Sequence, residues 1–171
     1  MPGGAASCAN PEPALTEPAA PATAPGPGMV AGEQFGSTRV LVGEDLELAV
    51  RLTQGTHPVH VDDTAAKRAG LQGRIFHGAV TAAIMAAAIG GRFSDSLIAL
   101  LEQNNRYLLP VYPGDTLRAT WTVERLRESR QAGQWVVELA GQTVNQHGAT
   151  VLEASARVLW RGALVAPVPR A

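Results

Sequence analysis

The chain has 171 residues, of which 46% are hydrophobic and 17% charged, and its formal net charge is −1. These values suit one globular domain with a sizeable core and leave no basic field to hold nucleic acid or an anionic membrane surface. A single cysteine excludes an internal disulfide, and no apolar run is long enough to span a bilayer, so we expect a cytoplasmic protein.

The first 28 residues differ in composition from the rest of the chain. They are rich in alanine, proline and glycine and contain no aromatic residue, so they cannot bury enough apolar surface to offset the entropy of ordering them. We therefore predict a disordered tail over residues 1–28, a folded domain over residues 29–162 and a short C-terminal tail over residues 163–171.

The first predicted elements lead to a pair of histidines. Residues 35–42 alternate weakly and predict a strand, and residues 43–55 predict a helix that ends at a glycine. The apolar face of this helix is formed by Leu46, Ala49, Val50 and Leu52. An extended loop containing His57 and His60 should follow, and then a short helix with Asp62 or Asp63 as its cap and Gly70 as its end.

Residues 78–92 predict the central element of the domain. Positions 79–89 carry no charged side chain on any face, which is typical of a helix buried on all sides. At 1.5 Å per residue this helix is ~20 Å long, too short to cross a membrane. The segments 101–112, 116–128, 134–146 and 149–162 read as consecutive strands with short turns, which favours an antiparallel meander. The expected fold class is α+β, with the sheet wrapped around the apolar helix.

The two histidines leave three interpretations open. His57 and His60 flank a proline and could form an acid–base site, an acid–base site that lacks one part, or two ordinary loop residues. They lack the further ligands that a stable metal site needs, so we expect neither a metal nor another cofactor.

Three stretches together resemble the MaoC-like family of (R)-specific enoyl-CoA hydratases and related dehydratases. They are HPVHVDDTAAKRAGLQGRIFHGAVTAA at residues 57–83, LPVYPGDTL at 109–117 and NQHG at 145–148. The resemblance runs from about residue 30 to residue 160 and implies the hot-dog fold. It also implies a 3-hydroxyacyl or 2-enoyl thioester of CoA or acyl carrier protein as substrate. The edge that a single wrapped sheet would leave exposed leads us to expect a homodimer formed by edge-to-edge pairing of two sheets.

The resemblance also assigns roles to individual residues. His60 matches the family's catalytic histidine, and Gly78 matches the glycine whose backbone N–H receives the thioester carbonyl. The family's asparagine falls at His57, which we keep as a third catalytic candidate, and its catalytic aspartate falls at Gly55. We group Gly55 with two candidate substrate-binding residues: Arg74, which could pair with a substrate phosphate or with an acid across a dimer, and His77, which could bridge a strand to the buried helix.

The site therefore looks like a hydratase site whose acid has been removed. Dehydration of a 3-hydroxyacyl thioester should suffer less than hydration, because it needs no anchored water, and Gly55→Asp should restore water addition. The retained His60 and Gly78 favour a dehydratase or hydratase with an atypical site, or one recruited to a related enolate-type reaction such as a cyclisation. The missing acid favours the alternative, a non-catalytic acyl-thioester-binding subunit that pairs with an active partner.

Overall fold

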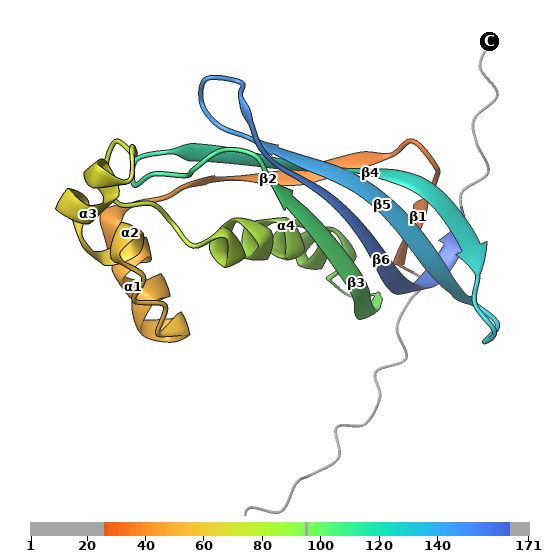
Figure 1. Cartoon of the computed structure of the whole chain (residues 1–171). Coiled ribbons are helices and arrows are strands. Elements are labelled where there is room, and N and C mark those ends of the chain that lie inside the picture. The colour runs from red at the N-terminus through yellow and green to blue at the C-terminus, as the bar shows by residue number, and fades with distance from the viewer. Residues whose placement is uncertain (1–25, 95, 165–171) are drawn as a thin grey trace, which may run out of the picture.

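The computed structural model describes residues 26–94 and 96–164. Its elements in chain order are β1 (Gly26–Met29), β2 (Gln34–Val40), α1 (Gly43–Thr53), α2 (Pro58–Val61), α3 (Asp63–Arg68), α4 (Gly78–Phe93), β3 (Leu97–Tyr107), β4 (Thr116–Glu128), β5 (Gln134–Val144) and β6 (Thr150–Leu164). Figure 1 shows the curved sheet passing over α4, with α1, α2 and α3 gathered at one end. Within the described ranges, no helix combines the length and the apolar character needed to cross a membrane.

The sheet confirms the α+β prediction and corrects one part of its expected strand order. Strands β4, β5 and β6 form the antiparallel meander, and β2 pairs with β4 at one edge. The expected meander began with β3, but β3 pairs with β6 and not with β4. The segment 108–115 is not part of a strand and carries the chain from one side of the sheet to the other. A strand pattern in the sequence does not specify which neighbour the strand will have.

Helix α4 lies where the sequence predicts it, but only one side is buried. Its core-facing residues are Thr81, Ile84, Met85, Ala88, Ile89 and Phe93. Ala79, Ala83, Ala87 and Gly91, which recur every four residues, are exposed. The prediction that this helix is buried on all sides is therefore wrong for the single chain, because the sheet covers only one face of it.

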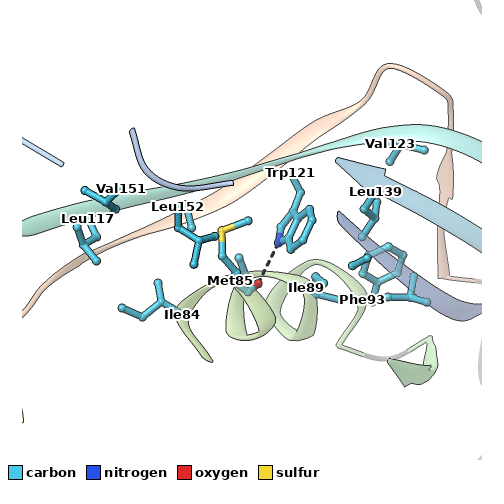
Figure 2. Close-up of a cluster of buried hydrophobic side chains, with 14 of the residues drawn as sticks. Ile84, Met85, Ile89, Phe93, Leu117, Trp121, Val123, Leu139, Val151 and Leu152 are labelled. Carbon is cyan, nitrogen blue, oxygen red and sulfur yellow. Dashed lines mark hydrogen bonds between the residues drawn. The ribbon is translucent and has the colours of Figure 1, made fainter. Parts of the chain in front are cut away.

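The core joins α4 to the inner face of the sheet (Figure 2). In β4 the alternating apolar residues Leu117, Ala119, Trp121 and Val123 are all buried. The Trp121 Nε1–H donates to the Met85 carbonyl oxygen at 2.9 Å, so this large buried side chain has its polar atom satisfied. The Thr143 hydroxyl lies 2.9 Å from the Met85 sulfur. These contacts fix α4 against the middle strands.

The expected boundary between tail and domain falls inside a strand. β1 pairs in parallel with the end of β6, and Met29 is buried in the core. Arg92 of α4 pairs with Glu33 at 2.6 Å and donates to the Gly28 carbonyl, which ties this segment to the helix. The remaining parts of the two expected tails, residues 1–25 and 165–171, lie outside the described residues.

Helix α1 and the histidine segment also differ from expectation. Leu46 and Ala49 are buried as predicted, but Leu52 is 82% exposed. At 3.6 residues per turn, Leu52 points about 120° away from Leu46, so the two residues do not share a face. The segment around Pro58 is not extended but forms the one-turn helix α2, with the proline at the first helical position where its missing N–H costs nothing.

Candidate active site

The segment before His60 is held by the end of α1. Gln54 takes a left-handed conformation with φ of 52° and ends the helix. The Thr53 hydroxyl donates to the Ala49 carbonyl at 2.8 Å and accepts from the Gly55 N–H at 3.1 Å. These bonds fix the turn from which α2 and its histidine start.

His60 is placed with one ring nitrogen occupied and one free. Its Nδ1 lies 2.8 Å from the Ile75 carbonyl oxygen. A carbonyl oxygen can only accept, so in the neutral ring Nδ1 carries the proton and Nε2 carries the lone pair. The Ile75 N–H in turn donates to the Val59 carbonyl at 3.1 Å, which holds the two segments together. The fold therefore presents His60 as a hydrogen-bonded base.

The surroundings of His60 favour its neutral form. Burial lowers the pKa of His60, and the neighbouring His77 and His57 act in the same direction, while the bond to the Ile75 carbonyl acts against them. A pKa below the usual value of ~6.5 leaves the ring unprotonated at neutral pH. This is the protonation state that a proton acceptor needs.

Gly78 opens α4 beside the same cavity as His60. The cavity has a volume of about 530 Å³ and is lined by His60, Ile75, Phe76, Gly78, Ala79, Thr81, Tyr107, Leu108, Leu109, Pro110, Val111 and Val151. The first N–H groups of a helix have no partner within it and carry its positive dipole end. A partial negative charge on a ligand oxygen would therefore be stabilised at the start of α4.

Tyr107 is a member of the cavity that the sequence analysis does not single out. A Cβ added at Gly78 would lie 2.9 Å from the Tyr107 ring, so glycine is what allows this close approach. Tyr107 ends β3 and is half exposed. The stretch LPVYPGDTL, which contributes Leu109, Pro110 and Val111 to the lining, starts two residues after it. The presence of a tyrosine two residues before that stretch was the available signal.

His77 lies between His60 and Gly55, and neither His77 nor Gly55 lines the cavity. The His77 Nε2 is 2.8 Å from the Gly55 carbonyl oxygen. The His77 ring stacks on His60 with centroids 3.8 Å apart and an interplanar angle of 26°. The structure thus brings three of the predicted site residues into one cluster, and a fourth, Gly78, directly follows His77.

His57 and Arg74 are placed away from the cavity. The exposed His57 caps α2, and its ring centroid is 6.1 Å from that of His60. The Arg74 guanidinium binds Glu47 at 2.6 Å and lies 3.6 Å from Asp63, both in the same chain. Neither residue is in the cavity lining. The geometry therefore does not support a catalytic role for His57, and it gives Arg74 partners other than a substrate phosphate.

A second, more apolar cavity of about 650 Å³ lies between α1, α4 and β2. Its lining includes Leu48 and Leu52 from α1 and Val80, Ala83 and Ala87 from α4. Ala79, in the first turn of α4, lines both cavities.

Known proteins resemble this chain in sequence and in structure. The profile of the MaoC like domain matches residues 35–145. A mitochondrial 3-hydroxyacyl-[acyl-carrier-protein] dehydratase of Arabidopsis thaliana is 24% identical over 121 residues, which cover 71% of this chain and 70% of that protein. An (R)-specific enoyl-CoA hydratase of Rhodospirillum rubrum is 28% identical over 123 residues, covering 71% of this chain and 85% of the relative.

Solved structures agree with these relatives. The R-hydratase PhaJ1 of Pseudomonas aeruginosa superposes with a TM-score of 0.67 at 25% identity, over 84% of this chain and 92% of the other. The MaoC-like dehydratase of Rhodospirillum rubrum superposes with a TM-score of 0.69 at 20% identity, over 80% and 96%, and supports the fold alone. The curved sheet around α4 is thus the α+β hot-dog fold, and the chain belongs to the MaoC-like domain family.

Proposed function

We propose that this protein interconverts 3-hydroxyacyl and 2-enoyl thioesters of CoA or acyl carrier protein, as a carbon–oxygen lyase. The observation that carries the proposal is that His60 and Gly78 border one cavity, although they come from different elements. One supplies an unprotonated ring nitrogen and the other a free N–H at a helix start. The named activities of the two curated relatives point to the same reaction class.

The chemistry needs only these two groups and the substrate. In dehydration, His60 Nε2 takes the proton from Cα, and the electron pair of that bond moves toward the thioester, whose oxygen accepts from the Gly78 N–H. The pair then forms the Cα=Cβ bond as the Cβ–O bond breaks, and the departing hydroxyl takes the proton from the His60 imidazolium. Water and the 2-enoyl thioester result, and the imidazole is neutral again.

The missing acid at position 55 affects both directions of this reaction. Gly55 offers no carboxylate to hold water, and forward and reverse reactions cross the same transition state. The loss therefore lowers kcat/KM for hydration and dehydration together, and concentrations set the direction. The expectation that dehydration suffers less than hydration does not hold for kcat/KM. The same base and N–H pair would also serve another enolate-type reaction, including a cyclisation.

The second cavity offers a place for the acyl chain. Its lining includes Ala79, the residue after Gly78, and apolar residues of α1 and α4. A chain whose carbonyl oxygen rests at Gly78 could therefore extend along α4. Ala83→Phe should lower kcat/KM for a decenoyl thioester while leaving that for a crotonyl thioester within about twofold, since only the longer chain reaches this position.

The decisive assay follows the absorbance of the enoyl thioester with crotonyl-CoA and 3-hydroxybutyryl-CoA. His60→Ala should lower kcat at least ~100-fold, the range that a positioned acid–base group contributes. His57→Ala is the matched control, because this histidine lies outside the cavity, and it should keep the wild-type rate within about threefold. Equal rates for wild type and His60→Ala would overturn the assignment.

The absence of a side chain at Gly55 favours an alternative function, that of a non-catalytic acyl-thioester-binding subunit. A subunit without catalysis would bind an acyl thioester, turn over neither substrate alone and gain activity only with a MaoC-like partner. Calorimetric binding of a non-reactive thioester analogue, combined with no turnover by the purified chain, would favour this role over the enzyme.

A further inference from the structure

The contact between His77 and Gly55 gives a reason for the glycine at position 55. A Cβ on residue 55 would lie 2.4 Å from His77 Nε2 and 2.8 Å from its Cδ2, well inside contact distance. The same Cβ would lie 3.0 Å from the Thr53 hydroxyl oxygen. Any side chain at this position would therefore push against the His77 ring, so the loss of the acid and the placement of His77 depend on each other.

We propose that His77 is a positioning residue that takes over from the absent acid: anchored on the Gly55 carbonyl, its ring stacks on His60 and fixes the working orientation of that base. The predicted loss of activity rests on the proposed function, whereas the predicted orientation of the His60 ring does not. It assigns His77 an effect through His60 and not a contact with the substrate, since His77 does not line the cavity.

The hydrogen bonds of the two rings define their tautomers. His60 donates through Nδ1 to Ile75, and His77 donates through Nε2 to Gly55, because both partners are carbonyl oxygens. His60 is thus held through its Nδ1 and His77 through its Nε2, while the two ring centroids lie 3.8 Å apart. His77 Nδ1 is buried and has no hydrogen-bond partner. Because a hydrogen bond and a stacking contact both hold the His77 ring, this ring restricts rotation of the His60 ring.

The stack also bears on the charge of His60. The titratable side chains next to His60 are His57, whose centroid is 6.1 Å away, His77 in the stack, and Tyr107 in the shared cavity. Burial is the largest cause of the lowered pKa of His60, and His77 adds to it, since two protonated rings in a stack would repel each other. Replacing the His77 imidazole by a side chain that cannot be protonated should therefore raise the pKa of His60.

Two substitutions separate the anchor from the stack. His77→Phe keeps a ring against His60 but loses the donor to Gly55, whereas His77→Gln keeps a donor of similar reach but loses the ring. Both should lower kcat about tenfold or more with KM within about twofold, because misplacing a catalytic group by 1 Å can cost ~100-fold. The acid limb of kcat/KM should move to higher pH in both. His147→Gln, at an exposed histidine in the turn after β5, is the control and should change neither quantity.

Nuclear magnetic resonance tests the arrangement without a substrate. The chain has four histidines, so the ring signals can be assigned by substitution. Nitrogen-15 spectra of the wild type should show His60 as the Nδ1–H tautomer and His77 as the Nε2–H tautomer. The pKa of His60, followed by titration, should rise in His77→Phe and in His77→Gln and stay unchanged in His147→Gln.

The outcomes distinguish this inference from the proposed function. If both His77 variants are folded and keep wild-type kcat, pH limb and His60 titration, His77 is only structural and the inference is wrong. A loss of melting temperature alone, with the His60 titration unmoved, also overturns it. If the wild type turns over neither thioester but the pKa of His60 rises in both His77 variants, the proposed function fails and the positioning contact stands.

Discussion

Under the proposed function, the protonation of His60 sets the pH range over which this site can work. As burial and its histidine neighbours lower its pKa, the ring stays neutral at pH values where an ordinary histidine is half protonated. The base is therefore lost only as the pH falls through this lowered pKa. We expect the acid limb of kcat/KM to have its midpoint below pH ~6.5. Initial rates in buffers of constant ionic strength measure it, and a midpoint above that value would contradict the burial argument.

At residue 55 the structure reverses an expectation drawn from the sequence. Gly55→Asp was expected to restore water addition, but its Cβ would meet His77 at 2.4 Å. The ring would have to leave its place on His60 before a carboxylate could hold water. We now expect Gly55→Asp to lower crotonyl-CoA hydration, and we expect Gly55→Ala to lower it too for the same steric reason.

The comparison between these two variants isolates the carboxylate. Both add the Cβ, and only one adds an acid. If Gly55→Asp hydrates crotonyl-CoA faster than both Gly55→Ala and the wild type, the site has room for the family's acid, and the coupling of Gly55 to His77 is wrong.

Among the elements, β5 and α4 place glycines in opposite environments. Gly141 of β5 stands opposite Trp121 of β4, and its added Cβ would lie 2.4 Å from the Trp121 ring and 2.6 Å from the Met85 methyl. Gly90 of α4 has open space at the same position. The same substitution to alanine should therefore have effects of opposite sign in the two elements.

We expect Gly141→Ala to lower the free energy of unfolding by about 1–3 kcal/mol, because the core must move to accept it. Gly90→Ala should raise it by about 0.5–1 kcal/mol, since alanine loses less backbone freedom in a helix. Urea unfolding followed by tryptophan fluorescence measures both. Equal changes in the free energy of unfolding would show that the close packing around Trp121 does not make Gly141→Ala destabilising.

At the scale of the whole molecule, β3 is an edge strand that is suited to pairing with a second copy of the chain. Among the described strands it pairs with β6 alone, and it carries the exposed side chains Ile98, Leu100 and Leu101. Unpaired backbone groups and apolar side chains along one edge favour strand pairing with a second copy. We therefore keep the prediction of a homodimer with one continuous sheet.

Light scattering at micromolar concentration should give twice the mass of the chain. Leu101→Lys should shift the protein to the monomer by placing a charge on this edge, whereas Leu48→Lys on α1 should not. The two leucines are a matched pair, 51% and 54% exposed. A wild-type protein that is monomeric at this concentration would exclude edge pairing as the stable state.

The sequence by itself determined the elements whose signals are local. The strand at residues 116–128, the helix at residues 78–92 and the helix end at Gly70 follow from periodicity and backbone preference, and the structure confirms them. The three stretches at residues 57–83, 109–117 and 145–148 were together sufficient to suggest the MaoC-like family, and the family profile over residues 35–145 confirms it.

Only the tertiary structure decided which groups meet. The pairing of β3 with β6 and the exposure of one face of α4 depend on packing between segments distant in sequence. The same is true of the site: Tyr107 comes over Gly78, Arg74 binds Glu47, and His77 fills the space at Gly55. A sequence shows that a side chain is absent at position 55, but only the folded chain shows which ring occupies that space, since the occupant is chosen by three-dimensional proximity.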